Sequence, residues 1–253
     1  MQEIQTKPGK PRYALFDALR GATMVSMVLY HFCYDLFVVE GLLPDWPFLP
    51  AAHIWQQSIC CTFILLAGFC WQWGQKHNLR RGLLLNACGL LITGITWLIM
   101  PQQIILFGVL NFIGCAILLT IPAHSLLRHI PPVLGTVLAL LLFAATKQAS
   151  QGTVGLFSLQ IRVPAGLYTP LLTPVGFPAA GFWSSDFFPL VPWLFLFWAG
   201  YFLNRIFAGQ AQPQKWAQTE IPALSRLGRY SLIVYMLHQP VCFALAWTMA
   251  HIL

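Results

Sequence analysis

Charged residues are scarce in this chain of 253 residues. They make up 8% of the sequence, against about 25% in an average soluble domain, and only seven residues are acidic. No polar stretch is long enough to form a soluble domain, and neither a glycine-rich phosphate loop nor a nucleotide fingerprint is found. These absences exclude an ordinary water-soluble enzyme. They also leave no reason to expect a nucleic-acid partner.

Two further patterns are missing. The seven cysteines show no metal-site spacing, so we expect no metal ion. We interpret them as small residues that pack between helices. The chain also lacks the internal repeat that transporters often carry.

Apolar residues, in contrast, are abundant. They form 58% of the chain, and the mean hydropathy is +0.68. We therefore predict an all-α, polytopic transmembrane helix bundle in which residues 1–253 form a single domain. Seven spans are expected at about 14–38, 54–74, 82–100, 104–122, 132–147, 188–207 and 230–251.

Basic residues sort by side of the membrane. Eleven Lys and Arg residues precede span one, follow spans two and four, or lie between spans six and seven, whereas only Lys147 and Arg162 fall on the other side. The positive-inside rule then places the N-terminus in the cytoplasm, with residues 1–12 as a cytoplasmic tail, and the C-terminus outside. Span one is too long and too charged for a signal peptide, so we expect it to be retained in the membrane.

The longest connection runs over residues 148–187 and is rich in Pro, Gly and apolar residues. Long loops without regular structure are usually functional. We interpret this one as an outward loop, or a re-entrant cap over a cavity.

Span one carries the most informative residues, Asp17, Arg20, His31 and Asp35. At 100° per residue, Arg20 and His31 lie within about 20° of each other, and both aspartates lie about 60° from Arg20. Ionisable groups are costly in lipid, so this face is expected to turn toward protein or water. Asp17 and Arg20 can neutralise each other as an ion pair that anchors the helix end.

His31 and Asp35 are four residues apart and therefore neighbours on a helix. A carboxylate beside an imidazole fixes its tautomer and raises its basicity, as a general base requires. The alternative is that His31 is a polar packing contact.

Span seven places Ser231, Tyr235 and His238 within about 60° on one face. His238 lies only about 12 Å from the cytoplasmic end, level with Arg20 rather than His31, so a direct contact between the two histidines is not expected. Its alternative role is that of a hydrogen-bonded core histidine.

Three further sets of polar residues are candidates for substrate binding. Asp186 is expected near the outer boundary, where it contacts substrate or is simply a solvated carboxylate. Asn111 in span four is explained equally well by helix packing. The cytoplasmic turns bearing Arg80, Arg81, Arg226 and Arg229 follow from the topology rule, but a phosphorylated donor would need such a cluster.

Four segments carry a resemblance to a known family. They are FDALRGATMVSMVLYHFCYDL from residue 16, LFGVLNFIG (106–114), SSDFFPLVPWLFLFWAG (184–200) and LGRYSLIVYMLHQPV (227–241). Together they resemble the heparan-α-glucosaminide N-acetyltransferase catalytic-domain family in its short bacterial form. The spacing from Arg20 to His31 also resembles the signature of acyltransferase type 3 proteins.

The resemblance implies an enzyme that takes an acetyl or other acyl group from cytoplasmic acyl-CoA and passes it to an amine or hydroxyl, often of a sugar, on the outer side. It implies catalytic roles for His31, Asp35, Arg20 and His238. Binding roles then fall to the remaining candidates, Asp17, Asn111, Asp186, Ser231, Tyr235 and the four arginines Arg80, Arg81, Arg226 and Arg229.

Two alternatives stay open from the residues alone. Intramembrane His, Asp and Arg also suit a proton-coupled small-molecule transporter. A non-catalytic membrane subunit could use the same polar groups to hold partner helices. The acyl group, the acceptor, the choice between base and covalent nucleophile for His31, and homo-oligomer formation are likewise open.

Overall fold

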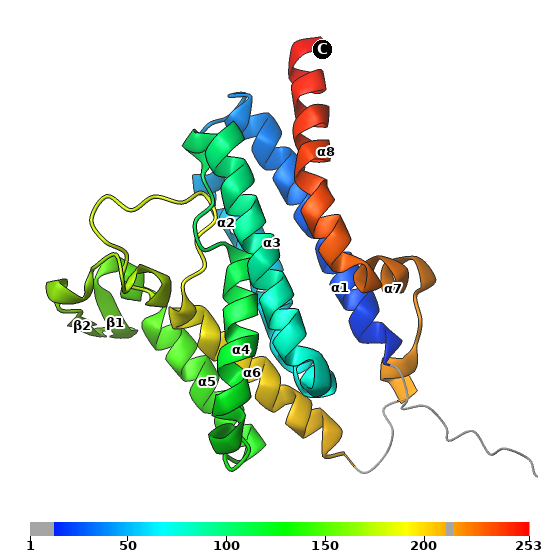
Figure 1. Ribbon diagram of the computed structural model, residues 1–253, viewed down its shortest axis with the longest axis vertical. Coiled ribbons are helices and arrows are strands. Elements are labelled where there is room, and N and C mark those ends of the chain that lie inside the picture. The colour runs from blue at the N-terminus through cyan, green and yellow to red at the C-terminus, as the bar shows by residue number, and fades with distance from the viewer. Residues whose placement is uncertain (1–12, 211–214, 253) are drawn as a thin grey trace, which may run out of the picture. The chain divides into compact units, whose positions relative to one another are not determined.

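The computed structural model describes residues 13–210 and 215–252, and the predicted tail 1–12, with its three basic residues, lies outside them. Figure 1 shows a helical protein with one small β-hairpin. Within these described residues, seven helices are long and apolar enough to cross a membrane, in agreement with the predicted number of spans. They cover Ala14–Val39, Pro50–Phe69, Gln72–Ile99, Val109–Leu127, Pro132–Gln151, Leu190–Ala208 and Ser231–Ile252.

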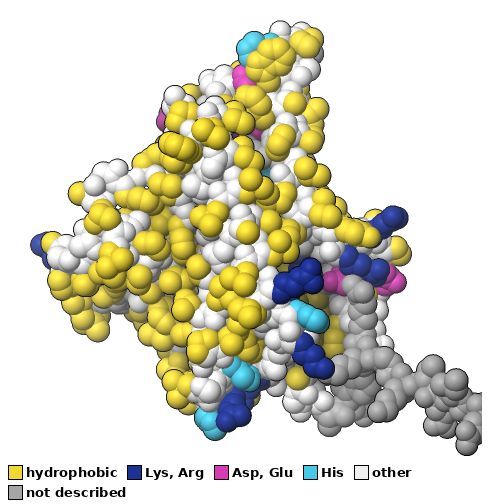
Figure 2. Space-filling model, viewed as in Figure 1, with side chains coloured by type: hydrophobic (Ala, Val, Ile, Leu, Met, Phe, Trp, Pro, Cys, Tyr) yellow, Lys and Arg dark blue, Asp and Glu magenta, His cyan; other side chains and the backbone are white. Residues whose placement is uncertain are grey.

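Several boundaries differ from those predicted. Polar residues continue a helix beyond its apolar run, so the third span begins at Gln72 rather than at 82. The fourth span begins at Val109 rather than 104, because a short 3-10 turn (Pro101–Gln103) and an extended stretch precede it. Hydrophobic side chains cover most of the face seen in Figure 2, as expected for a surface in contact with lipid.

The described residues group into two compact units, one from the parts of the chain up to Thr62 and from 215 onward, the other from Phe63 to Gln210. The first unit contains α1 (Ala14–Tyr34), which continues as a π-helical turn (Asp35–Val39), the first part of α2 (Pro50–Phe69), α7 (Pro222–Arg229) and α8 (Ser231–Ile252). Helix α1 packs against both α7 and α8. In Figure 1, α1 and α8 run in the same direction.

Two glycines allow α1 and α7 to touch through their backbones. A Cβ atom on Gly21 would collide with the carbonyl of Leu224, and one on Gly228 with the carbonyl of Asp17. Ser225 adds a hydrogen bond from its hydroxyl to the Ala14 carbonyl, at 3.2 Å. The amphipathic α7 lies in the connection between the predicted spans six and seven and is thus fixed against the first turns of α1.

The second unit contains α3 (Asn78–Ile99), α4 (Val109–Leu127), α5 (Pro132–Thr146) and α6 (Leu190–Ala208). Helix α3 packs on α4, and α5 and α4 pack on α6. Arg205 near the end of α6 ties this unit together, because its guanidinium donates to the carbonyls of Leu127, Arg128 and Ile130 at 2.8 to 3.0 Å.

The connection 148–187 is not without regular structure. It contains an antiparallel hairpin of β1 (Thr153–Leu156) and β2 (Leu159–Arg162), followed by short 3-10 turns. Strand β1 packs against α5 (Figure 1). Each strand has only four residues, too few for the alternation of polar and apolar residues to stand out in the sequence.

Candidate active site

Two histidines meet where α1 packs on α8. The rings of His31 and His238 lie with their centroids 4.8 Å apart and their planes at 63°. The prediction that they do not touch was wrong. It counted both helices from the same membrane boundary, whereas α7 crosses α1 at Asp17 and Gly21 immediately before α8 begins, so α8 starts part-way along α1.

The hydrogen bonding of His238 defines its tautomer. Its Nδ1 lies 2.6 Å from the backbone carbonyl of Tyr235. Because a carbonyl oxygen can only accept, Nδ1 must carry the proton and donate, which leaves Nε2 with a free lone pair in the neutral ring. Nε2 is buried without a hydrogen-bond partner, in a side chain that is 8% exposed. Such an orphaned acceptor is costly unless a ligand supplies a donor.

Asp35 lies beside this pair but does not hold His31. Both of its carboxylate oxygens accept hydrogen bonds from the Gln239 side-chain amide, at 2.9 and 3.1 Å, and its side chain is 1% exposed. The expected role of Asp35 in orienting His31 is therefore not supported by a hydrogen bond, because the carboxylate turns to α8 instead. Gln239, the residue next to His238, was missed because an uncharged amide gave no signal in the sequence.

Aromatic rings surround His31 on its other side. Tyr30 meets the His31 ring edge-on at 6.1 Å and also packs against Trp46 and Trp55, with centroids 5.0 and 5.4 Å away. Trp55 is fixed in turn, since its Nε1 donates to the Ser26 hydroxyl at 2.8 Å. This apolar wall restricts the orientation of His31 and excludes water from that side.

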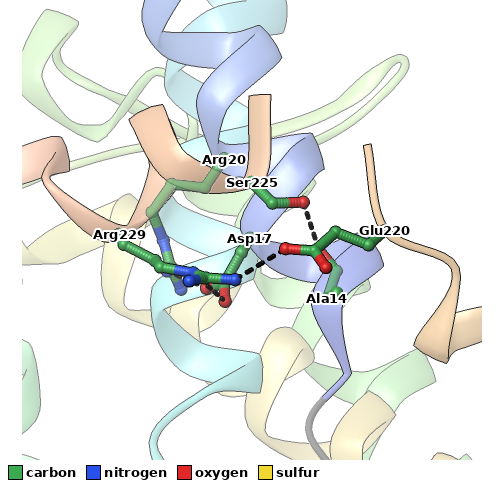
Figure 3. Close-up of polar contacts among 6 residues, drawn as sticks. All are labelled: Ala14, Asp17, Arg20, Glu220, Ser225 and Arg229. Atoms are coloured by element: carbon green, nitrogen blue, oxygen red, sulfur yellow. Dashed lines mark hydrogen bonds and ion pairs between the residues drawn. The ribbon is translucent and has the colours of Figure 1, made fainter. Parts of the chain in front are cut away.

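The other end of α1 carries a charged cluster (Figure 3). Arg20 lies 3.2 Å from Asp17, which confirms the predicted ion pair. Arg229 of α7 reaches the same carboxylate at 4.0 Å and pairs with Glu220 at 2.8 Å. Arg226, also on α7, is exposed. On α8, Tyr235 packs its ring against His238 at 5.3 Å, and Ser231 begins the helix.

The remaining candidates belong to the second unit. Arg80 is exposed near the start of α3, and Arg81 donates to the Asn78 side chain at 3.2 Å. Asn111 is buried between α3 and α4, where it lies against Gly89 and its amide faces the Asn86 carbonyl at 3.4 Å. This contact is the helix packing that the sequence offered as an alternative.

Asp186 caps a helix. Its Oδ2 accepts a hydrogen bond from the backbone amide of Val109, the first residue of α4, at 3.3 Å. Two serines next to Asp186 bind the same loop: the Ser184 hydroxyl accepts from the Leu106 amide, and the Ser185 hydroxyl donates to the Gln103 carbonyl. Desolvation raises the pKa of Asp186 to about 6, and the bond from Val109 opposes this rise.

Among the residues with described positions, no group of three His, Cys, Asp or Glu side chains is arranged to hold a metal ion. The polar groups that converge are those between α1 and α8: an imidazole pair with one free basic nitrogen, a fixed carboxylate and an apolar wall. This set can accept a proton from a bound hydroxyl or amine.

These features define a multi-pass membrane protein in which two histidines meet between the helices α1 and α8. The family model for the heparan-α-glucosaminide N-acetyltransferase catalytic domain matches residues 12–240, and the chain belongs to that family. Searches of curated proteins and of solved structures each gave no match.

Proposed function

We propose that this protein transfers an acetyl or other acyl group from acyl-CoA to an amine or hydroxyl acceptor, with the His31 and His238 pair as its catalytic centre. The family supports acetyl transfer by a membrane enzyme. The observation that carries the proposal is the buried Nε2 of His238, a basic nitrogen that lacks only a proton donor. A hydroxyl or amine of the acceptor supplies that donor.

In the proposed reaction, the acceptor oxygen or nitrogen gives its proton to His238 Nε2 and attacks the thioester carbonyl. A C–O or C–N bond forms, the C–S bond breaks, and the CoA thiolate takes the proton back from the imidazolium. His31, 4.8 Å from His238 by ring centroids, either acts as the base itself or accepts the acyl group in a covalent intermediate.

Asp35 and Gln239 act as positioning residues in this scheme. Gln239 holds the carboxylate of Asp35, and the same segment of α8 carries His238. Arg20, paired with Asp17, is the proposed cation along the path of the donor or beside its carbonyl oxygen. Ser231 and Tyr235 are proposed to contact substrate from α8.

The donor brings phosphates, which need cations. The proposed contacts in the first unit are Arg226 and Arg229, with charge-assisted hydrogen bonds to phosphate oxygens. Arg80 and Arg81 of the second unit are separate candidates for such a contact, proposed from the sequence alone. With a cytoplasmic N-terminus in the bacterial inner membrane, these arginines face the cytoplasmic pool of acyl-CoA. Asp186, Asn111 and Asp17 are weaker candidates for substrate contacts, since each is engaged within the protein.

The test uses the full chain in lipid nanodiscs with acetyl-CoA and a panel of amino sugars and hydroxylated sugars. His238→Ala is expected to lower the rate of thiol release by about 10²- to 10⁴-fold, the usual worth of a general base. His251→Ala is the matched control, because His251 lies on α8 too but is exposed, and it is expected to keep full activity. Full activity in His238→Ala would overturn the proposal.

The same preparation separates the alternatives. A proton-coupled transporter exchanges substrate across vesicles without acyl-CoA and releases no thiol. Removal of the histidines from a non-catalytic subunit changes assembly but no turnover.

A further inference from the structure

The β-hairpin of residues 153–162 has one polar face and one apolar face. Residues paired directly across an antiparallel ladder point to the same side. The pairs Val154 with Ile161 and Leu156 with Leu159 therefore form an apolar face, and Thr153 with Arg162 and Gly155 with Gln160 form the polar one.

The apolar residues of β2 are uncovered. Leu159 is 76% exposed and Ile161 is 64% exposed, although β1 itself packs against α5. An apolar strand face left open in this way indicates a surface that contacts something other than water.

Phe157 at the tip of the hairpin gives a second, independent observation. It is 95% exposed, and its φ is +52°, in the left-handed region. Two-residue hairpin turns favour Gly, Asn or Asp at such a position, because other side chains are strained there. A bulky aromatic residue is therefore kept at a cost to the fold, although the described residues leave its side chain almost wholly exposed.

The surroundings of the hairpin favour a lipid surface as the partner. The fifth span ends at Gln151, so β1 starts within two residues of the membrane-spanning helix. That span exposes leucines along its length, among them Leu134, Leu138 and Leu141, as expected for a helix in contact with lipid. Lys147 and Arg162 are exposed at the same end and can meet anionic headgroups.

We propose that this hairpin is an interfacial anchor, which inserts Phe157, Leu159 and Ile161 into the headgroup and upper acyl region of the leaflet at the end of α5. Aromatic and aliphatic side chains flanked by cations are what such an anchor requires. The anchor does not depend on acyl transfer.

Photocrosslinking of the full chain in vesicles of phosphatidylcholine and phosphatidylglycerol tests the proposal. The photoreactive residue p-benzoylphenylalanine replaces Phe157 in one protein, Gln160 on the polar face in a matched control, and lipid-facing Leu138 in a positive control. Intact-mass spectrometry is expected to find lipid adducts at 157 at least about five-fold above those at 160 and comparable with those at 138.

Other adducts would overturn the proposal. Crosslinks from 157 to a second copy of the chain would indicate a protein interface, and crosslinks within the chain would indicate a cap. Lipid adducts no more frequent than at 160 would refute the anchor as well. Lys147→Gln combined with Arg162→Gln is expected to abolish any preference for phosphatidylglycerol among the adducts, and an unchanged preference would exclude these cations.

Discussion

At the scale of single residues, buried polar atoms and their partners explain most of what the candidate site can do. The lone pair on His238 Nε2 exists because the Tyr235 carbonyl fixes the proton on Nδ1. The carboxylate of Asp35 is tolerated at 1% exposure because the Gln239 amide donates to both of its oxygens. Replacing one polar atom of either pair therefore leaves its buried partner without a hydrogen bond, which costs more stability than the small change in volume would.

Gln239→Leu is expected to destabilise the protein by about 1–3 kcal/mol, because the buried carboxylate of Asp35 loses its donor. The double variant Asp35→Leu with Gln239→Leu is expected to recover much of that loss, since neither polar group is then left alone. Unfolding in detergent measures all four proteins of this cycle. Strictly additive effects would show that the two side chains do not interact.

Asp186 gives a pH dependence with a definite sign. Its pKa rises from 3.8 to about 6 in the folded protein, so the folded state binds the proton more tightly than the unfolded chain does. The stabilisation is complete below pH 3.8 and is lost as the pH rises through 6. Asp186→Asn keeps an oxygen to accept from Val109 and is expected to remove this part of the pH dependence.

Thermal unfolding between pH 4 and 7 in a buffer series checks this expectation. Asp45→Asn, at an exposed carboxylate outside the spans, serves as the control and is expected to leave the profile unchanged. A parallel profile for Asp186→Asn and the parent would contradict the assignment.

At the scale of helices, the contact between α1 and α7 depends on two missing side chains. Gly228→Ala places a methyl group against the Asp17 carbonyl, so the helices must separate, with an expected loss of about 1–3 kcal/mol. Gly94→Ala in α3 is the matched control, because nothing lies near its Cβ position, and it is expected to be neutral or slightly stabilising. Equal stability of the two variants, measured by unfolding, would refute the close contact.

The same contact explains what the sequence could not predict about the site. Helical periodicity predicts Asp17, Arg20, His31 and Asp35 on one face, and the pair of Asp17 with Arg20, which the structure confirms, followed from their spacing. The meeting of His31 with His238 did not follow, because it depends on where α7 crosses α1 before α8 begins. Local spacing carries no information about such an offset between distant segments.

At the scale of the whole molecule, apolar length determines the number of spans. Runs near 20 apolar residues allowed all seven to be predicted, whereas their ends depended on polar residues that extend a helix past the lipid, as at Gln72. The hairpin was missed because strands of four residues give almost no periodic signal.

Seven spans, the number of candidates among the described residues, predict that Tyr13 and Ile252 lie on opposite sides of the membrane, and the basic residues predict a cytoplasmic N-terminus. Alkaline phosphatase, which is active only outside the cytoplasm, reports the side on which it is fused. Fusion after Leu253 is expected to give an active reporter, and fusion after Arg128, between spans four and five, an inactive one. The reverse pattern would invert the topology.

At the π-helical turn Asp35–Val39, the orientation of the residues that follow depends on the number of residues in the turn. Beyond it, Glu40 lies 3.7 Å from His251 near the end of α8. A π-turn holds one residue more than an α-helical turn, so deleting one of its residues would let α1 continue as a regular helix with Glu40 near its present place. Inserting a further residue would instead rotate Glu40 by about 100° around the helix axis and away from His251, while His31, on the earlier turn, would stay in place. Tolerance of such an insertion should therefore separate the contact between Glu40 and His251 from the contact between His31 and His238.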